Sequence, residues 1–321
     1  MLFRSSEAPP VIISIFLGEQ LEDVVKQLVE TGVASSAKKG EKLATGVSTL
    51  PDFVKDATDR NRTSPFAFTG NKFEFRTVGS SDSIASPNTT INAIVAEAFC
   101  EAADRLEKAE DFDMAVHDLI KEYMTKHQRI LFSGNGYSKE WYEEAMRRGL
   151  PNIQSTIEAA PTLTTDKAVK LFEKFGIFTR VELESREEII YETYAKTINI
   201  EALTMIDMAG KDIIPAVAAY TGELANTVVT VKEAGAPATA QTELLVEVDS
   251  LLAEAKKALK HLEECTVDAN KIENAKERAF YYKDVVDVAM TALRKPVDKL
   301  EMLVDSDIWP MPTYGELMFE I

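Results

Sequence analysis

The sequence contains very little cysteine and histidine, with two cysteines and three histidines in 321 residues. Cys100 and Cys265 are too few for a disulfide framework or a thiolate zinc site, and both lie in sequence typical of helices, where a buried free thiol is the usual state. His117, His127 and His261 lie on charged helical stretches with no second histidine or cysteine at metal-ligand spacing. The sequence therefore excludes a disulfide scaffold, predicts solvated surface histidines and favours a reducing compartment.

Basic residues are scarce relative to acidic ones. The chain has 36 lysines and arginines against 53 aspartates and glutamates, so its formal net charge is −17. A chain of this charge is repelled by phosphate backbones and anionic lipid surfaces, which argues against a general nucleic-acid binder or a membrane ligand. Any phosphate-binding site must therefore be local.

The first hydrophobic run, "VIISIFL" at residues 11–17, is short. It has seven residues, whereas a membrane-spanning helix needs about 20. Pro9 and Pro10 precede the run, Gly18 ends it, and no small-residue cleavage site comes before the acidic stretch "EQLED". This pattern is typical of a buried strand rather than a signal peptide, so we expect a cytoplasmic protein with no membrane partner.

Hydrophobic residues make up 45% of the chain, which is enough for a substantial core. Up to about residue 100 the signals are mixed, with the strand at 11–17 and a helix near 19–31. After Pro87 and Asn88, which resemble a helix start, helical periodicity dominates. Before the helix that follows "SGNGYS" (133–138), Ser138 is a candidate N-cap, and we interpret this stretch as a glycine turn because it lacks the lysine of a phosphate-binding loop. Further helices are predicted at about 165–176, 183–208 and 209–234.

The C-terminal region has the pattern of a helical hairpin. Apolar residues recur at alternating spacings of three and four over 245–262 and over 272–293. Each run is short, so an antiparallel bundle within the domain is favoured over a long coiled coil, and Pro296 is expected to end or kink the second helix. In the tail, Leu317, Phe319 and Ile321 alternate with other residues, which predicts a short strand or extended segment packed in a groove.

The segment "KFEFR" at 72–76 alternates charged and aromatic residues. This period of two predicts a strand in which Phe73 and Phe75 face a core while Lys72, Glu74 and Arg76 share the other face, about 6.5 to 7 Å apart. A solvated strand face is one interpretation. The other is a reaction site, because these residues and the nearby "RNR" (60–62) form a basic island in an acidic chain. A carboxylate-bound metal beside several cations is typical of phosphoryl transfer, and arginine suits bidentate contact with phosphate.

Several long motifs carry a resemblance to a known family. "EAPPVIISIFLGEQ" (7–20) and "DRNRTSPFAFTGNKFEFRTVGSSDSIASPNTTINAIVAEAF" (59–99) are similar to the C-terminal part of the catalytic domain of a type III glutamine synthetase. The stretches "FSGNGYSKEW", "EKFGIFTRVELESREE", "KTINIEALTMIDMA" and "WPMPTYGELMFEI" resemble the helical C-terminal region peculiar to that type. The resemblance covers nearly the whole chain after residue 6.

The resemblance implies an ATP-dependent ligase. In the family, glutamate attacks the γ-phosphate of ATP, and ammonia then displaces phosphate from γ-glutamyl phosphate with the help of Mg²⁺ or Mn²⁺. Glu7 matches the flap glutamate that helps to deprotonate ammonium, and Arg62 matches an arginine near the transferred phosphoryl group. Lys72 stands at a position near ATP, Glu74 matches a metal ligand, and Arg76 matches the arginine that holds substrate glutamate.

The resemblance also implies a fold and shows two departures from it. The fold is α+β: strands and helices ending the catalytic β-sheet or half-barrel domain (1–129), then a mainly helical bundle with a docking tail (130–321). A second family arginine would fall on Ala67. The family's other metal-ligand glutamates, its nucleotide-contacting histidine and its N-terminal domain all precede the motif containing Glu7, so we interpret the chain as a C-terminal piece that is inactive alone.

Two further functions stay open. One is a non-catalytic assembly module, in which the region from about 130 to 308 joins subunits or rings, since type III enzymes are large homo-oligomeric rings. The other is a phosphotransferase similar to guanidino kinases, whose expected cysteine-bearing motif is not found. The resemblance favours the ligase, with glutamate, ammonia and ATP as its small-molecule partners.

Overall fold

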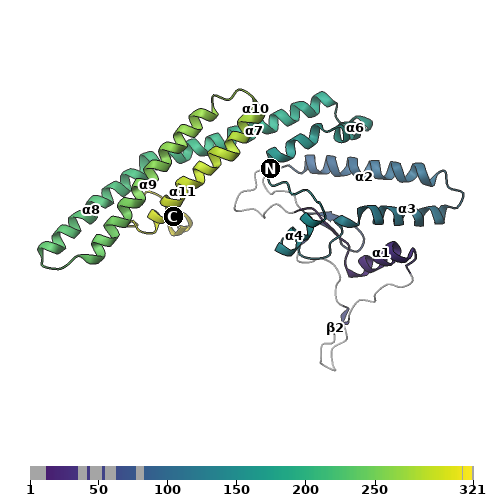
Figure 1. The fold of residues 1–321 in the computed structure, drawn as a ribbon, viewed down its shortest axis with the longest axis horizontal. Coiled ribbons are helices and arrows are strands. Elements are labelled where there is room, and N and C mark those ends of the chain that lie inside the picture. The colour runs from purple at the N-terminus through teal and green to yellow at the C-terminus, as the bar shows by residue number, and fades with distance from the viewer. Residues whose placement is uncertain are drawn as a thin grey trace. The chain divides into compact units, whose positions relative to one another are not determined.

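The computed structural model of the chain describes residues 12–34, 42–43, 53–54, 63–76, 83–312 and 314–319. It is mostly helical with a small three-stranded sheet (Figure 1). Two compact units are present, residues 1–183 and 184–321. The expected domain boundary at 129/130 lies inside the first unit and stays a prediction. Across the described ranges, no helix has the length and apolar character needed to cross a membrane.

The three-stranded sheet brings together segments that are distant in sequence. Its order is β1 (Ile15–Phe16), β4 (Phe66–Phe68) and β5 (Phe73–Phe75), with β1 and β4 parallel and β4 and β5 antiparallel. Gly70, at the turn between β4 and β5, has a φ of 101°, which a residue with a side chain rarely adopts. A separate antiparallel pair consists of β2 (Lys42–Leu43) and β3 (Phe53–Val54). The predicted strand at 11–17 is thus confirmed only at Ile15–Phe16, toward its end.

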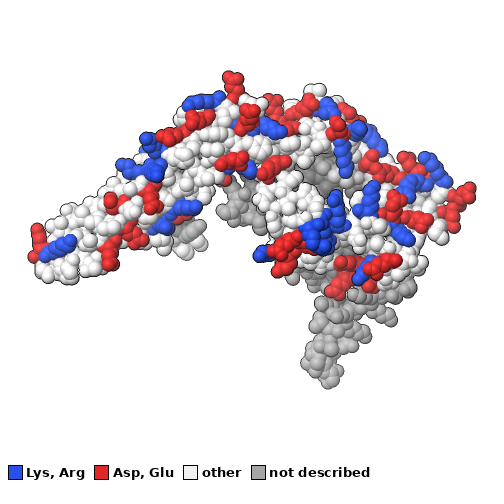
Figure 2. Space-filling view, in the orientation of Figure 1, with Lys and Arg blue, Asp and Glu red and all other residues white. Residues whose placement is uncertain are grey.

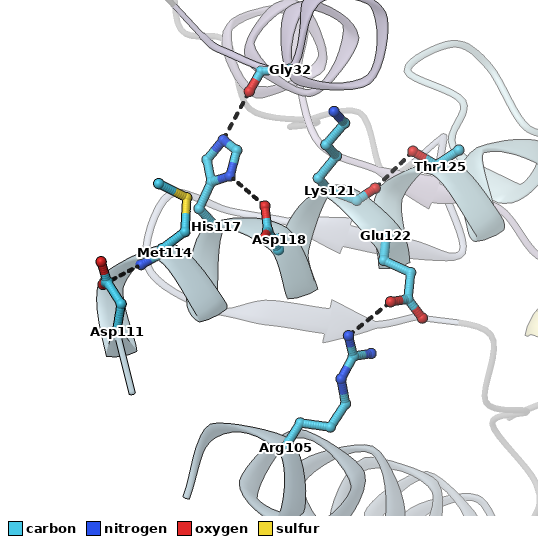
Figure 3. A network of polar contacts seen from close by, with 9 residues as sticks. All are labelled: Gly32, Arg105, Asp111, Met114, His117, Asp118, Lys121, Glu122 and Thr125. Atoms are coloured by element: carbon cyan, nitrogen blue, oxygen red, sulfur yellow. Dashed lines mark hydrogen bonds and ion pairs between the residues drawn. The ribbon is translucent and has the colours of Figure 1, made fainter. Parts of the chain in front are cut away.

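Three helices pack together in the first unit, namely α1 (Glu19–Thr31), α2 (Ala85–Leu106) and α3 (Phe112–His127). Figure 3 shows the polar contacts of α3. Nε2 of His117 lies 2.9 Å from the carbonyl oxygen of Gly32, just after α1, and Arg105 of α2 forms an ion pair with Glu122 at 2.8 Å. His117 is therefore not simply solvated, as the sequence had suggested, because it links α3 to the end of α1. The N-cap of α3 is Asp111, which accepts a hydrogen bond from the Met114 amide.

A small core forms around Trp141 on α4 (Lys139–Arg147), which follows the short 3-10 helix η1 (Gln128–Ile130). Ser138 caps α4 by accepting a hydrogen bond from the Trp141 amide at 3.2 Å, as predicted. The indole of Trp141 stacks on Phe132 with ring centroids 4.3 Å apart, and its Nε1 donates to the Ile12 carbonyl at 3.0 Å. Trp141 is almost fully buried, so it fixes the segment before β1 against α4.

The rest of the first unit packs on α2. After α5 (Thr156–Ala159) and η2 (Ala160–Thr164), helix α6 (Asp166–Lys174) lies against α2. The residues in this core are Ala93, Val169, Phe172 and Leu183. Lys174 also forms an ion pair with Glu97 of α2 at 2.5 Å.

The second unit is a bundle of long helices. The elements are α7 (Arg180–Met208, which begins in the first unit), η3 (Ala209–Ile213), α8 (Ile214–Glu233), α9 (Thr239–Ala269), α10 (Ala275–Tyr281), η4 (Tyr282–Val286) and α11 (Asp287–Glu301). Helix α9 packs against both α8 and α11, which confirms the predicted helical hairpin (Figure 1). On the face drawn in Figure 2, acidic and basic side chains are interspersed over the helices.

Two predictions for the C-terminal region are corrected in part. Of the two effects expected of Pro296, it does not end the helix: α11 continues to Glu301, because Val297 and Leu300 on the far side of the proline pack into the bundle core. A kink at Pro296 stays a prediction. The tail forms a short helix, α12 (Tyr314–Phe319), instead of an extended segment. Leu317 and Phe319 are exposed on it. The docking expected at Ile321 lies outside the described residues.

Candidate functional site

The register of β4 and β5 decides which side chains share a face. Phe66 lies opposite Phe75, Phe68 lies opposite Phe73, and Ala67 lies opposite Glu74. Because directly opposed residues of an antiparallel pair point to the same side, the four phenylalanines share one face and Glu74 lies on the other. The ring centroids of Phe66 and Phe73 are 5.6 Å apart, and those of Phe68 and Phe73 are 5.2 Å apart.

On the other face, Lys72, Glu74 and Arg76 form the line of charged side chains that the alternation in 72–76 predicted. We call it the β5 row. Lys72 Nζ lies 3.1 Å from Oε1 of Glu74, and Arg76 donates from Nε and Nη2 to Oε2 of Glu74 at 3.2 and 3.0 Å. The side chains are 65% exposed for Lys72, 34% for Glu74 and 15% for Arg76. The cation nearest the protein interior is therefore the arginine, which the resemblance assigns to substrate glutamate.

The two cations control the charge of Glu74. Hydrogen bonds from Lys72, and next from Arg76, hold the pKa of the Glu74 carboxyl below its ordinary value of 4.5. The carboxylate is therefore ionised at neutral pH and has a cation on each of its oxygens. A divalent cation binding there has to displace or rearrange these contacts.

The aromatic face is only partly buried. Phe75 is half-buried as expected, but Phe73 is 51% exposed, so the prediction that both face a core is correct for only one of them. β5 is an edge strand in the order β1, β4, β5, and its outer side has no strand neighbour among the described residues. The rings of Phe66 and Phe68 shield one part of Phe73 and leave the rest open.

The "SGNGYS" stretch holds this sheet in place. The Gly136 amide donates to the Thr63 carbonyl at 2.8 Å, and Ser64 Oγ lies 3.4 Å from the Gly134 carbonyl. A Cβ at Gly136 would come within 3.0 Å of that Thr63 oxygen, so the close approach needs glycine. The sequence predicted the glycine turn, but its contact with the start of β4 is non-local and gave no signal in the sequence.

The segment just before that turn extends the sheet. Leu131 forms an isolated parallel bridge with Ile15, and the Phe132 amide donates to the Ile15 carbonyl at 3.1 Å. The hydrogen-bonded backbone segments therefore lie side by side in the order 131–132, β1, β4 and β5. The charged row of β5 thus lies on an element that is fixed by neighbours on the inner side.

The structure does not describe every residue of the predicted site. Glu7 and Arg62, with the neighbouring Arg60, lie outside the described residues. In the part of the chain that the structure describes, no three acidic, histidine or cysteine side chains are grouped to hold a metal ion. Ala67, where the resemblance would place an arginine, is fully buried opposite Glu74, so an arginine there would need space that this strand pair lacks.

Comparisons with known proteins agree with the resemblance. Residues 115–232 match the glutamine synthetase C-terminal domain family. The chain is 39% identical over 330 residues to a glutamine synthetase from Butyrivibrio fibrisolvens and 38% identical over 327 residues to a type-3 glutamine synthetase from Dictyostelium discoideum. A glutamine synthetase from Bacteroides fragilis (strain YCH46) is 37% identical over 329 residues. Each alignment covers 98% of this chain but only 44 to 45% of the relative's length.

The relatives and the domain match agree. Residues 115–232 match the glutamine synthetase C-terminal domain, and the chain is similar almost end to end, at 37 to 39% identity, to the C-terminal part of glutamine synthetases.

Proposed function

We propose that this chain supplies one part of the active site of an ATP-dependent glutamate–ammonia ligase. The observation that supports this most is the row of Lys72, Glu74 and Arg76, which occupies one face of β5 with Glu74 bonded to both cations. In this proposal Arg76 binds the carboxylate of glutamate, and Lys72 binds a phosphate of ATP as a point charge. Arginine and lysine suit these two tasks because a planar guanidinium can bind a carboxylate bidentately, whereas an ammonium is a flexible point charge.

The family implies Mg²⁺ or Mn²⁺, which would neutralise charge on the phosphate groups when bound. The described residues offer a single carboxylate, Glu74, and both of its oxygens are bonded to cations. One such carboxylate does not fit a divalent ion by itself. We therefore expect Glu74 to contribute one metal ligand only when further carboxylates are present.

The resemblance gives roles to the two remaining candidate residues. Glu7 would take a proton from ammonium, and Arg62 would stabilise charge on the transferred phosphoryl group. Both roles rest on the resemblance alone. Since the chain spans less than half the length of the relatives it matches, we propose that the 321 residues alone have no synthetase activity.

Formation of γ-glutamyl hydroxamate with ATP and Mg²⁺ or Mn²⁺ tests this proposal on the purified chain. The expected result is no turnover and, because the other carboxylates are absent, the same calorimetric Mn²⁺ titration for wild-type chain and Glu74→Gln. Clear turnover by the wild-type chain would contradict the incomplete site. Mn²⁺ binding by the wild-type chain that Glu74→Gln abolishes would contradict the need for further carboxylates.

A second candidate function is assembly. Ile200 and Leu203 are exposed large apolar residues on α7, and Val246 is exposed on α9, within the region that the sequence assigns to subunit contacts. If the helical region joins subunits of a cytoplasmic ring, the chain should self-associate at micromolar concentration. Sedimentation velocity measures this, and Leu203→Glu should shift the distribution toward monomer.

A further inference from the structure

A hollow of about 520 Å³ in the first unit is lined by an unusual number of cations. Its walls come from α1, the end of α3, η1 and the end of α4, and they carry two glutamates and five basic residues: Lys26, Lys126, Arg129, Arg147 and Arg148. This is a local excess of three positive charges in a chain whose net charge is −17. Figure 2 shows a group of basic side chains, with acidic ones beside it, where Figure 1 draws α4.

One wall of the hollow is fixed by its own contacts. Glu144 accepts hydrogen bonds from Arg147 and Arg148, which hold the pKa of its carboxyl below the ordinary value. Arg148 also donates to the Leu131 carbonyl at 2.8 Å and lies over the Trp141 ring. Glu144 thus offsets one of the two positive charges of Arg147 and Arg148, and its contacts fix the position of both side chains.

The other cations have weak partners. Within the described ranges, no carboxylate lies at ion-pair distance from Lys126 or Arg129, and Lys26 reaches only Glu30 at 4.0 Å. The C-termini of α3 and α4 end beside the hollow, and their partial negative charge explains one cation at each helix end. It also accounts for Arg129, because η1 directly follows α3, but it does not explain Lys26, which lies on α1 and lines the same space.

We propose that this hollow binds a small anion bearing phosphate groups. Arg129 offers a planar fork for two phosphate oxygens, and Lys26 and Lys126 offer point charges. The hollow is separate from the β5 row, so its ligand is an additional one. The Arg129 carbonyl accepts from Arg148, and Leu131 bridges to β1, so a ligand on Arg129 contacts the segment that extends the sheet.

The test is a calorimetric titration of the full 321-residue chain with inorganic pyrophosphate at fixed ionic strength. Lys126→Gln and Arg129→Gln should each weaken binding about tenfold, because each removes a charge-assisted contact. Lys170→Gln is the matched control, since it removes an exposed lysine of the same unit that does not line the hollow. Lys72→Gln on β5 should also leave this binding unchanged, which separates the hollow from the proposed ligase site.

Three results of the titration would overturn the proposal. They are no pyrophosphate binding, equal affinity of wild-type chain and Arg129→Gln, or a loss of affinity in Lys170→Gln as large as that in Arg129→Gln. Citrate, a tricarboxylate, should bind at least about tenfold more weakly than pyrophosphate, and equal affinity would show a non-selective basic patch. A variant with altered folding would confuse the comparison, so a second measurement uses the wild-type chain. Bound pyrophosphate should protect Lys126 from an amine-acylating reagent. Absence of protection would also overturn the proposal.

Discussion

Arg76 donates two hydrogen bonds to one oxygen of Glu74, two residues earlier on the same face of β5. The residue proposed to hold substrate glutamate and the residue proposed to hold metal are thus bonded to each other in the free chain. Binding of either ligand has to compete with this ion pair. The ion pair therefore holds both side chains in position. In the proposed function, a metal ion or substrate replaces this contact when it binds.

The first prediction concerns the pH dependence of stability at Glu74. Because its pKa is lower in the folded chain than its ordinary value of 4.5, the ionised carboxylate stabilises the fold above that value. This stabilisation is lost as the pH falls through the folded pKa. The melting temperature of wild-type chain minus that of Glu74→Gln should therefore be largest from pH 5 to 7 and should approach zero in more acidic buffer.

The control for that prediction is Glu143→Gln. Glu143 is an exposed glutamate on α4 whose side chain lies 3.5 Å from Lys139, another exposed residue. A surface pair of this kind contributes little. A pH-independent difference for Glu74→Gln would show that the ion-pair row does not stabilise the strand.

The second prediction concerns the Trp141 core. Trp141→Ala removes a nearly fully buried indole, its stacking on Phe132 and its hydrogen bond to Ile12. We expect a loss of about 3 to 5 kcal/mol in the free energy of unfolding of the first unit. Urea denaturation followed by far-ultraviolet circular dichroism measures it. Tyr142→Ala, which truncates the exposed neighbour, should cost less than about 1 kcal/mol, and equal losses would contradict the assigned core.

The third prediction concerns thiol reactivity. Burial, and next the carboxylates of Asp268 and Glu264, raise the pKa of the buried Cys265 thiol, so little thiolate is present at neutral pH. Cys100 on α2 is only partly buried. A disulfide reagent should therefore label Cys100 quickly and Cys265 slowly at pH 7, and urea should remove the difference. In a Cys100→Ser chain the slow rate should rise as the pH increases, and fast labelling at pH 7 would be inconsistent with the structure.

The fourth prediction concerns the tail. Leu317, Met318 and Phe319 are exposed on α12, so deleting residues 314–321 should change the melting temperature by less than about 2 °C. Leu300→Ala is the comparison, because Leu300 is fully buried in the bundle core and its truncation should cost about 2 to 5 kcal/mol. The sequence predicts a tail packed in a groove, and deleting such a tail would destabilise the chain. A fall as large as that of Leu300→Ala would show that the tail docks after all.

Local patterns were the predictable part of this fold. The periodicity over 245–293 gave the hairpin of α9 and α11, and Ser138 gave the start of α4, because both signals depend only on neighbouring residues. The alternation in 72–76 likewise gave the charged face of β5. The sequence left open whether Pro296 ends or kinks its helix, and the helix continues because packing of Val297 and Leu300 overrides the local tendency to end there.

Contacts between distant segments were not predictable from one sequence. Gly136 meets Thr63, Trp141 meets Ile12, and His117 meets Gly32, and each pair is separated by more than 70 residues. The candidate site likewise has a part that local sequence spacing predicts and a part that it does not. The row on β5 followed from spacing, whereas the roles given to Glu7 and Arg62 depend on the family resemblance, and the cationic hollow required four separate elements to come together.

The central claim is that the β5 row belongs to a glutamine synthetase active site. The most direct test uses the full-length type-3 glutamine synthetase of Dictyostelium discoideum, in which the residue aligned with Glu74 is changed to glutamine and γ-glutamyl hydroxamate formation is measured with Mn²⁺. The residue aligned with Lys170 provides the control substitution. The expected result is a loss of turnover of at least about tenfold by an enzyme that is still fully folded at the assay temperature. Wild-type turnover in the glutamine variant would contradict the claim and leave Lys72, Glu74 and Arg76 as a solvated strand face.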